Sequence, residues 1–390
     1  MVTTADTRAE LARLIAFPTV SRDSNLNLIA YIQERLNEYD IGSRLVHNAE
    51  GTKANLLATI GPMVEGGVVL SGHTDVVPID DQDWHSDPFA LVERDGKLFG
   101  RGTCDMKCFL ATAIAALPDM IAANLPVPIH FAFSYDEEVG CAGVPSLIKL
   151  IREELPLPKA VIVGEPTDMK VVSAHKGVTA VTTFITGQEA HSSQTQLGFS
   201  AVMAAGRLIQ CVSDMNAANA SEANKNKDPR FEPDHTTMTV NVIQGGTALN
   251  ILAGHCTLTW DIRSLPGDDP QQYIDQFDAF CRDTVLPDMQ KTAPKSAIDI
   301  QVRAGTPALQ FENDSEAERL CRQLTGDNAT RAVSFAAEAG QFQESGLSTV
   351  ICGPGSIAQA HQPNEFITLE QVGLGTRFMT DLIEKLAKQG

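Results

Sequence analysis

The first 170 residues alternate between helical and extended patterns of apolar positions. Apolar residues recur every three or four positions in 6–16 and 25–39, the spacing of one face of a helix. Short apolar runs predict strands at 54–60, 67–70, 128–134 and 159–163, with helices at 106–123 and 144–153. Strands that alternate with helices predict a mostly parallel sheet covered by helices on both faces, which is an α/β fold.

The pattern changes after Gly177. We expect strands at 178–186, 237–243 and 256–263, helices at 200–212 and 270–281, and a polar loop at 217–234. One strand, one helix, two strands and one helix, with room for a final strand, are typical of a small α+β sandwich of the ferredoxin-like type.

The α/β pattern returns beyond Ala293 and ends in a helix expected at 369–388. A chain of 390 residues is long enough for about two domains. We therefore predict a catalytic domain formed by 1–176 and 290–390. Residues 177–289 would be an inserted domain.

Residues with metal-ligand side chains follow several of the predicted strands. The strands at 67–70, 128–134 and 159–163 are followed by His73, by Asp136-Glu137-Glu138 and by Glu165, respectively. In an open α/β sheet, ligands collect at the carboxyl ends of the strands. So many carboxylates in one crevice would repel one another unless cations neutralised them. The sequence therefore predicts a bound pair of metal ions.

Composition narrows the class of protein. The net charge of −19 disfavours nucleic acid and anionic membranes as partners. The longest apolar-rich window, 109–126, is interrupted by polar residues and proline, so we expect no membrane span. The N-terminal residues lack the pattern of a signal peptide. Eight scattered cysteines indicate free thiols, and we expect a cytoplasmic protein.

An ordered set of motifs resembles the co-catalytic zinc deacylase and exopeptidase family. This family includes acetylornithine deacetylases, succinyl-diaminopimelate desuccinylases, aminoacylases and glutamate carboxypeptidases. The motifs that are most similar to acetylornithine deacetylases are SGHTDVVP at 71–78, SYDEEVG at 134–140, ALN at 248–250, DIRSLPG at 261–267, AEAGQF at 337–342 and CGPGSIAQAH at 352–361. The resemblance implies a zinc-exopeptidase-like catalytic domain and an inserted lid and dimerisation domain.

The resemblance also implies a ligand set for two zinc ions per chain. Asp105 would bridge the ions, His73 and Glu165 would complete one site, and Glu138 and His361 the other. Imidazole and carboxylate suit zinc, with cobalt as a substitute, and an open position remains for water. The peptide bond that follows Asp105 is implied to be cis.

Three residues are assigned to catalysis. Glu137 is the expected general base, taking a proton from the water that bridges the metals. Asp75 is expected to accept a hydrogen bond from the His73 imidazole and to fix its tautomer. The resemblance implies that His191 reaches the active site of the partner subunit and stabilises the oxyanion, and hence that the chain forms a homodimer.

Four residues are assigned to the substrate, a small N-acyl amino acid. Arg263 resembles the clamp for an α-carboxylate, because its planar fork suits bidentate contact. Asn250 is expected to bind the same end, and the backbone at Gly355 to offer N–H groups. Glu338 is our candidate for binding the δ-ammonium of ornithine.

The resemblance implies hydrolysis of the amide of N2-acetyl-L-ornithine to acetate and L-ornithine, a step of arginine biosynthesis. A related acylamino-acid hydrolase, such as a desuccinylase or an aminoacylase, is the enzymatic alternative. The non-enzymatic alternative is an inactive binding or scaffold protein with the same fold. The intact base and ligand set argue against the scaffold.

Simpler interpretations stay open for single residues. Asp105 could cap the helix that follows it, and His191 could be an ordinary loop histidine. Arg263 could form a surface ion pair, and Glu338 could be an exposed helix residue.

Cysteines next to the bridging aspartate are a departure from the family pattern. Cys104 and Cys108 flank Asp105, where relatives usually carry small residues. Thiols are good zinc ligands, so an altered metal site is the alternative to two buried, inert thiols.

Overall fold

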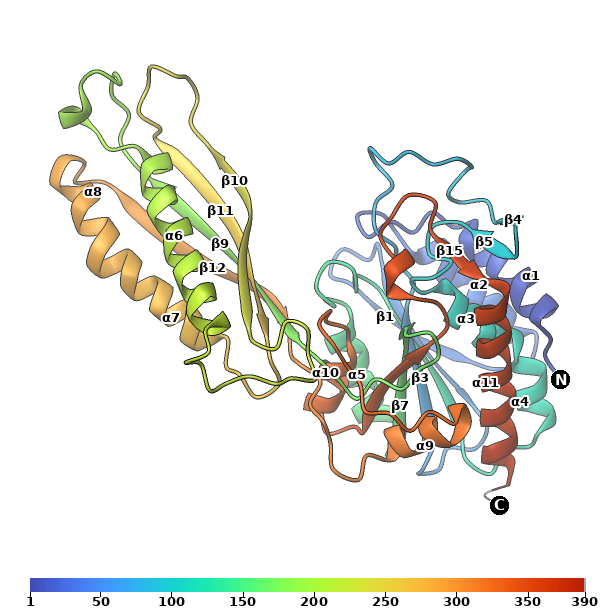
Figure 1. Ribbon diagram of the computed structural model, residues 1–390. Helices are drawn as coiled ribbons and strands as arrows, with labels where there is room; N and C mark the ends of the chain where they lie inside the picture. The colour runs from blue at the N-terminus through green and yellow to red at the C-terminus, as the bar shows by residue number, and fades with distance from the viewer. Residues whose placement is uncertain (389–390) are drawn as a thin grey trace. The chain divides into compact units, whose positions relative to one another are not determined.

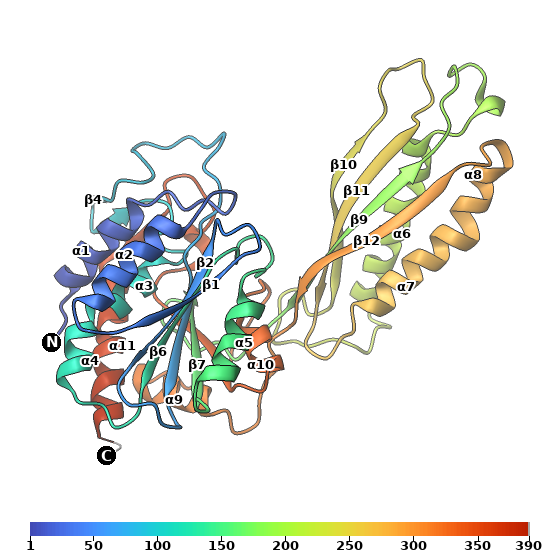
Figure 2. The same cartoon turned by 180° about the vertical axis from the view of Figure 1, so that it is seen from behind.

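The computed structural model describes residues 1–388 and divides into two compact units (Figures 1 and 2). The first unit contains Met1–Ala174, Leu309–Arg331 and the chain from Ala337 onward. The second unit contains His175–Ala308 and Ala332–Ala336, so it is inserted into the first. Each unit is described by itself.

The first unit is built on a six-stranded sheet in the order β1-β2-β6-β3-β7-β14. The strands are β1 (Ser43–His47), β2 (Ala54–Ile60), β3 (Val68–His73), β6 (Ile129–Ser134), β7 (Ala160–Pro166) and β14 (Thr349–Gly353). The four strands from β6 to β14 are parallel, whereas β1 and β2 are antiparallel additions at one edge. The prediction of a mostly parallel central sheet is confirmed.

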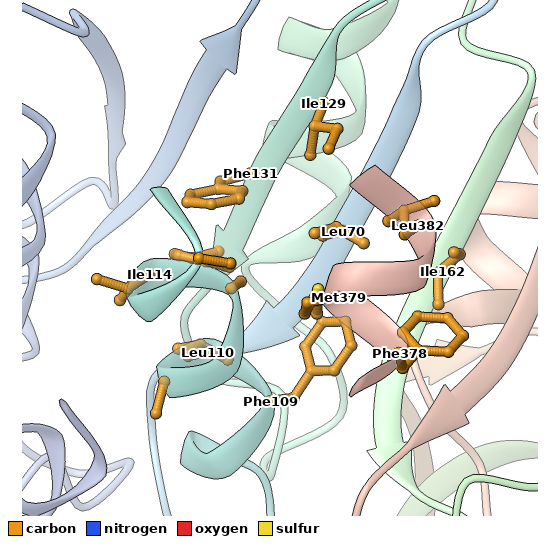
Figure 3. Close-up of a cluster of buried hydrophobic side chains, with 14 of the residues drawn as sticks. Leu70, Phe109, Leu110, Ile114, Ile129, Phe131, Ile162, Phe378, Met379 and Leu382 are labelled. Atoms are coloured by element: carbon orange, nitrogen blue, oxygen red, sulfur yellow. The ribbon is translucent and has the colours of Figure 1, made fainter. Parts of the chain in front are cut away.

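Helices cover both faces of this sheet (Figure 2). They are α1 (Thr4–Ile15), α2 (Leu26–Asn37), α3 (Lys107–Ala115), α4 (Leu117–Ala122), α5 (Val144–Glu154), α9 (Glu316–Thr325), α10 (Ala339–Glu344) and α11 (Leu369–Ala387). In Figure 3, α3 and α11 pack apolar side chains against the central strands. Because side chains alternate along a strand, Val68, Leu70 and Gly72 of β3 face these helices, and Ser71 and His73 face the other way.

Two glycines allow α3 to lie close against the sheet. A Cβ on Gly72 would lie 2.6 Å from the Met106 methyl carbon, and a Cβ on Gly164 would lie 2.0 Å from Cγ of Phe109. Any larger residue would therefore push α3 away. These glycines directly precede His73 and Glu165, so close packing and the polar site are specified by neighbouring residues.

Smaller elements complete the first unit and its junction with the second. A three-stranded sheet contains β4 (Val92–Arg94), β5 (Lys97–Phe99) and β15 (Phe366–Thr368), and a two-stranded sheet pairs β8 (Ala174–His175) with β13 (Ala332–Val333). Short 3₁₀ turns are η1 (Thr195–Leu197), in the second unit, and η3 (Ile357–Gln359). Among residues 1–388, no helix is both long enough and apolar enough to cross a membrane.

The second unit is a two-layer α+β sandwich. Its antiparallel sheet has the order β10-β11-β9-β12, from β9 (Gly177–Thr186), β10 (Thr237–Gly245), β11 (His255–Ser264) and β12 (Ala297–Thr306). The helical layer contains α6 (Ala201–Ala220), α7 (Gln271–Phe280), the π-helical turn η2 (Cys281–Val285) and α8 (Leu286–Thr292). The succession β-α-β-β-α-β is the ferredoxin-like arrangement expected from the sequence.

Several element boundaries differ from the prediction. The helix expected at 106–123 is divided at Ala116 into α3 and α4, with Pro118 in the first turn of α4, where proline is tolerated. Helix α6 continues to Ala220, into the stretch expected to be a loop. The second unit extends beyond Met289 because β12 pairs with β9.

Candidate metal centre

Five side chains with metal-ligand atoms meet at the carboxyl ends of the parallel strands. His73 Nε2 lies 3.0 Å from Oδ1 of Asp105 and 3.7 Å from Oε1 of Glu165. His361 Nε2 lies 3.2 Å from Oδ2 of Asp105 and 3.0 Å from Oε2 of Glu138. Each oxygen of Asp105 therefore faces a different histidine, which is the arrangement that a bridging carboxylate needs.

The hydrogen bonds leave some of these carboxylate oxygens without a donor. Oε1 of Glu138 and Oε1 of Glu165 are buried and have no hydrogen-bond partner among residues 1–388. A buried carboxylate oxygen without a partner is costly unless a cation binds it. The donor set contains only imidazole nitrogen and carboxylate oxygen, so it fits a divalent ion such as zinc.

The electrostatics of the site point the same way. Burial and the neighbouring Asp105 carboxylate together raise the pKa of Glu138 to about 7. Burial and the Asp105 charge likewise raise the pKa of Glu165 well above its usual range. Burial would lower the pKa of His73, but its hydrogen bond to Asp105 and the surrounding carboxylates raise it overall. The buried carboxylates of the site therefore repel one another, and bound cations would remove this repulsion.

The His73 ring is oriented by a backbone carbonyl. Its Nδ1 donates to the carbonyl oxygen of Asp75 at 2.8 Å, and the Asp75 carboxylate lies further away, at 3.7 Å. The predicted hydrogen bond from His73 to the Asp75 carboxylate is therefore wrong, because the ring donates to the Asp75 carbonyl. The carboxylate instead accepts hydrogen bonds from the amides of Glu137 and Glu138 and from the Ser21 hydroxyl. The Nδ1–H tautomer leaves Nε2 of His73 available for a metal.

Glu137 lies beside the candidate ligands, and its carboxylate accepts a hydrogen bond from a neighbouring thiol. Its ligand atom is within 4.8 Å of those of His73 and Glu165. Burial raises the pKa of Glu137 to about 8. The Cys141 thiol donates to Oε1 of Glu137 at 3.2 Å. The sequence predicts no role for Cys141. The only local signal is its spacing of four residues from Glu137, which corresponds to the turn in which the Cys141 amide donates to the Glu137 carbonyl.

Glu338 is not placed for a substrate ammonium. It is fully buried, and its carboxylate accepts hydrogen bonds from the hydroxyls of Ser71 at 2.5 Å and Ser134 at 2.8 Å. Both serines lie on the face of the sheet that is turned away from α3. A contact with ornithine would need an exposed carboxylate, so this burial argues against the predicted role.

Gly355 also has its amide engaged. Its N–H donates to Oε1 of Gln371 at 3.1 Å, so it is not available to a substrate here. Its φ of 96° lies in the region that favours glycine, and a Cβ would lie 2.6 Å from the sulfur of Cys104. The residue is needed for the turn.

The two thiols beside Asp105 do not join the donor cluster. Cys104 donates to the carbonyl of Ser356 at 3.2 Å, and burial raises its pKa well above the usual range. Burial raises the pKa of Cys108 to about 12. Neither thiol belongs to the groups of His, Cys, Asp and Glu side chains within residues 1–388 that could hold a metal ion. The peptide bond between Asp105 and Met106 is cis, as the family resemblance implied.

The remaining predicted residues lie in the second unit. His191 is exposed and hydrogen-bonds Ser193 at 2.7 Å, and its segment pairs with that of Asn250 through the amide of Ser192. Arg263 is on β11, where its Nε donates to Asp261 at 2.9 Å. The ion pair that the sequence left open for Arg263 is therefore present.

Comparison with known proteins identifies the family. The model of peptidase family M20/M25/M40 matches residues 69–385. An acetylornithine deacetylase of Myxococcus xanthus is 34% identical over 94% of this chain and 93% of its own length. A metallo-carboxypeptidase of Sulfolobus solfataricus has a TM-score of 0.80 at 16% identity, over 98% of this chain and 99% of its own.

A solved structure from Bacillus subtilis, described as a dinuclear metal-binding peptidase of family M20, has a TM-score of 0.66 at 14% identity and covers 99% of this chain and 98% of its own. These two structures share the fold. The near full-length match to the curated relative confirms the resemblance seen in the ordered motifs. The chain belongs to peptidase family M20/M25/M40.

Proposed function

We propose that the chain hydrolyses the amide bond of N2-acetyl-L-ornithine to acetate and L-ornithine, in arginine biosynthesis. The reaction type, metal-dependent hydrolysis, is inferred from the Asp105 carboxylate, each oxygen of which faces a different histidine. The substrate is inferred from the curated relative, which matches at 34% identity over nearly the whole chain.

His73, Asp105, Glu138, Glu165 and His361 would hold two zinc ions, for which cobalt is a substitute. When bound, the pair supplies a Lewis acid for the scissile carbonyl and lowers the pKa of water. The donor set and the two carboxylate oxygens without partners support this proposal.

Glu137 is the proposed general base. The Cys141 thiol holds Oε1, which leaves Oε2 to take a proton from the attacking water. The water oxygen bonds to the acetyl carbon, the C–N bond breaks, and Glu137 gives the proton to the departing amine. One carboxylate thus acts first as base and then as acid.

Residues of the second unit complete the proposal. His191 would stabilise the oxyanion in the partner's site, and Arg263 and Asn250 would bind the substrate carboxylate. The chain would therefore act as a homodimer through this unit. Its edge strand β10 supports this, because Val242 and Ile243 on that strand are about half exposed. We also propose a cytoplasmic location, in keeping with the eight free cysteines.

A substrate panel tests the proposal. The metal-loaded protein is assayed with N2-acetyl-L-ornithine, N-succinyl-diaminopimelate and N-acetylmethionine, and we expect the highest kcat/KM for the first. Glu137→Gln should keep its metal and lose about 10²–10⁴-fold in kcat. A preference for the succinyl substrate would indicate the desuccinylase alternative. No turnover of any substrate by the metal-loaded protein would indicate a binding or scaffold protein.

A further inference from the structure

A buried ion pair lies beside the metal centre and has no role in the chemistry described above. Nη1 of Arg101 is 2.7 Å from Oε2 of Glu365, and both side chains are 1% exposed. Burying two charges is costly, so a pair of this kind is weak evidence for stability alone. Its other contacts indicate what the pair does.

Glu365 fixes the loop that leads to the bridging aspartate. Its Oε1 accepts the backbone N–H groups of Cys104 at 2.8 Å and Asp105 at 3.1 Å. Its Oε2 accepts the N–H of Gly102 at 3.2 Å, and its own carbonyl accepts the N–H of Gly100 at 3.0 Å. Hydrogen bonds to an ionised carboxylate are among the stronger ones, so this loop is held from Gly100 to Asp105.

Arg101 extends the network to His361. Its Nη2 donates to Oε1 of Gln82 at 2.6 Å, and Nε2 of Gln82 donates to the carbonyl of His361 at 3.2 Å. The guanidinium also donates to the carbonyl of Gln362 at 3.3 Å and lies over the ring of Trp84, 5.1 Å from its centre. One ion pair is thus connected to the backbone of both Asp105 and His361.

His361 needs such support because its own packing is sparse. Its side chain is 54% exposed, and its φ of 61° lies in the left-handed region. Its imidazole must nevertheless stay near both Asp105 and Glu138. The hydrogen bonds to the backbone carbonyls of His361 and Gln362 therefore help to hold this imidazole in place.

We propose that Arg101 and Glu365 form a positioning pair that sets the geometry of Asp105 and His361 and thereby the affinity of the zinc ion that Glu138 and His361 would hold. The inference rests on the proposed metal-dependent hydrolysis. Groups that orient metal ligands typically contribute about 10–100-fold in metal affinity or activity. Neither residue belongs to the proposed metal or substrate ligands, and the contacts of both are with protein groups, so the effect of the pair should appear first in metal binding.

The test is metal titration of folded, full-length variants by competition with a chelator. In Glu365→Gln an amide NH₂ replaces one oxygen and must face a donor, either Arg101 or a backbone N–H. We expect the zinc ion held by Glu138 and His361 to bind about 10–100-fold more weakly, and the ion held by His73 and Glu165 to weaken less, because only Asp105 is shared between them. Arg101→Lys should weaken the same ion, because an ammonium cannot make the same planar contacts.

Glu10→Gln is the matched control. Glu10 is also a buried carboxylate; it accepts a hydrogen bond from Tyr31 at 2.5 Å and pairs with Arg13 at 3.2 Å. The Glu10→Gln substitution should lower the midpoint of thermal unfolding without changing the affinity for either zinc ion. If Glu365→Gln does not fold, Arg101→Lys and Gln82→Ala give the same readout.

The outcomes separate the inference from the proposed function. Wild-type affinity for both ions in folded Glu365→Gln, or in Arg101→Lys and Gln82→Ala, overturns the positioning role. Equal weakening in Glu10→Gln also overturns it, because the effect would then be general destabilisation. If the wild type binds two ions but does not hydrolyse acetylornithine, the proposed substrate is wrong, while weaker binding in the variants still supports the positioning pair.

Discussion

A buried histidine far from the candidate site should make the stability of the first unit depend on pH. His130 lies in β6 and is fully buried; its Nδ1 is 2.9 Å from the Thr59 hydroxyl. Its Nε2 has no hydrogen-bond partner within residues 1–388. Burial lowers the pKa of His130 to about 4.

The sign and size of the effect follow from this pKa. An unfolded histidine has a pKa of about 6.5, so acid protonates the unfolded chain first. The stabilisation is complete above about pH 6.5 and is lost as the pH falls toward 4. Each pKa unit corresponds to about 1.4 kcal/mol, so the whole loss is about 3 kcal/mol, with about 2 kcal/mol between pH 7 and pH 5.

Replacing His130 with asparagine removes the titration and keeps a polar partner for Thr59. The free energy of unfolding is measured with urea at pH 7, 6 and 5 on metal-free protein. The candidate metal ligands titrate in the wild type and in the variant alike, so their contribution cancels in the difference between the two proteins. The variant is less stable at pH 7 because it leaves a cavity, but it should lose about 2 kcal/mol less than the wild type between pH 7 and 5.

Val69→Ala provides the control, since Val69 pairs with His130 across β3 and β6 and does not titrate. It should destabilise the protein and keep the wild-type pH dependence. Equal pH dependence in His130→Asn and the wild type would refute the reasoning.

Four further predictions concern packing, the base, the metals and the dimer. Gly164→Ala should destabilise the fold by about 1–3 kcal/mol in urea unfolding, because the new methyl overlaps the Phe109 ring; an unchanged midpoint would contradict this. Cys141→Ala should lower kcat about 2–10-fold with little change in KM, and Cys141→Ser should recover most of it, because a hydrogen bond contributes about 0.5–1.5 kcal/mol. Chelation should abolish activity, and zinc at about 100 times its Kd should add about 2.7 kcal/mol to the free energy of unfolding; no shift would count against a folded-state metal site. Mixing inactive His191→Ala and Glu137→Gln subunits should restore activity in about half of the mixed sites, and no recovery despite proven subunit exchange would refute the role of His191 in the partner's site.

The central strands and most of the candidate metal ligands could be predicted from local sequence. Apolar runs identify β3, β6 and β7, and parallel strands present their carboxyl ends at one edge of a sheet. His73 and Glu165 could therefore be assigned to one crevice without knowledge of the loops. The register of the sheet then determines which face each side chain joins.

The supporting groups could not be predicted, because each depends on a partner distant in sequence. Arg101 and Glu365 are 264 positions apart and carry no local signal that they meet. Glu338 precedes a short helix whose orientation is not evident in the sequence, so its burial between Ser71 and Ser134 was missed.

The carboxylates of the site differ in whether the protein donates hydrogen bonds to both of their oxygens. Asp75, Glu338 and Glu365 each have both oxygens occupied by hydroxyl, amide or guanidinium donors of the protein. Their hydrogen bonds are all made within the protein, so they can fix the geometry of the site without a cation. Glu138 and Glu165 each keep a buried oxygen with no donor among residues 1–388, and for them a cation is the missing partner. The sequence predicts Asp75, Glu138, Glu165 and Glu338 in one site, but only the distribution of hydrogen-bond donors distinguishes the supporting carboxylates from those that would bind metal.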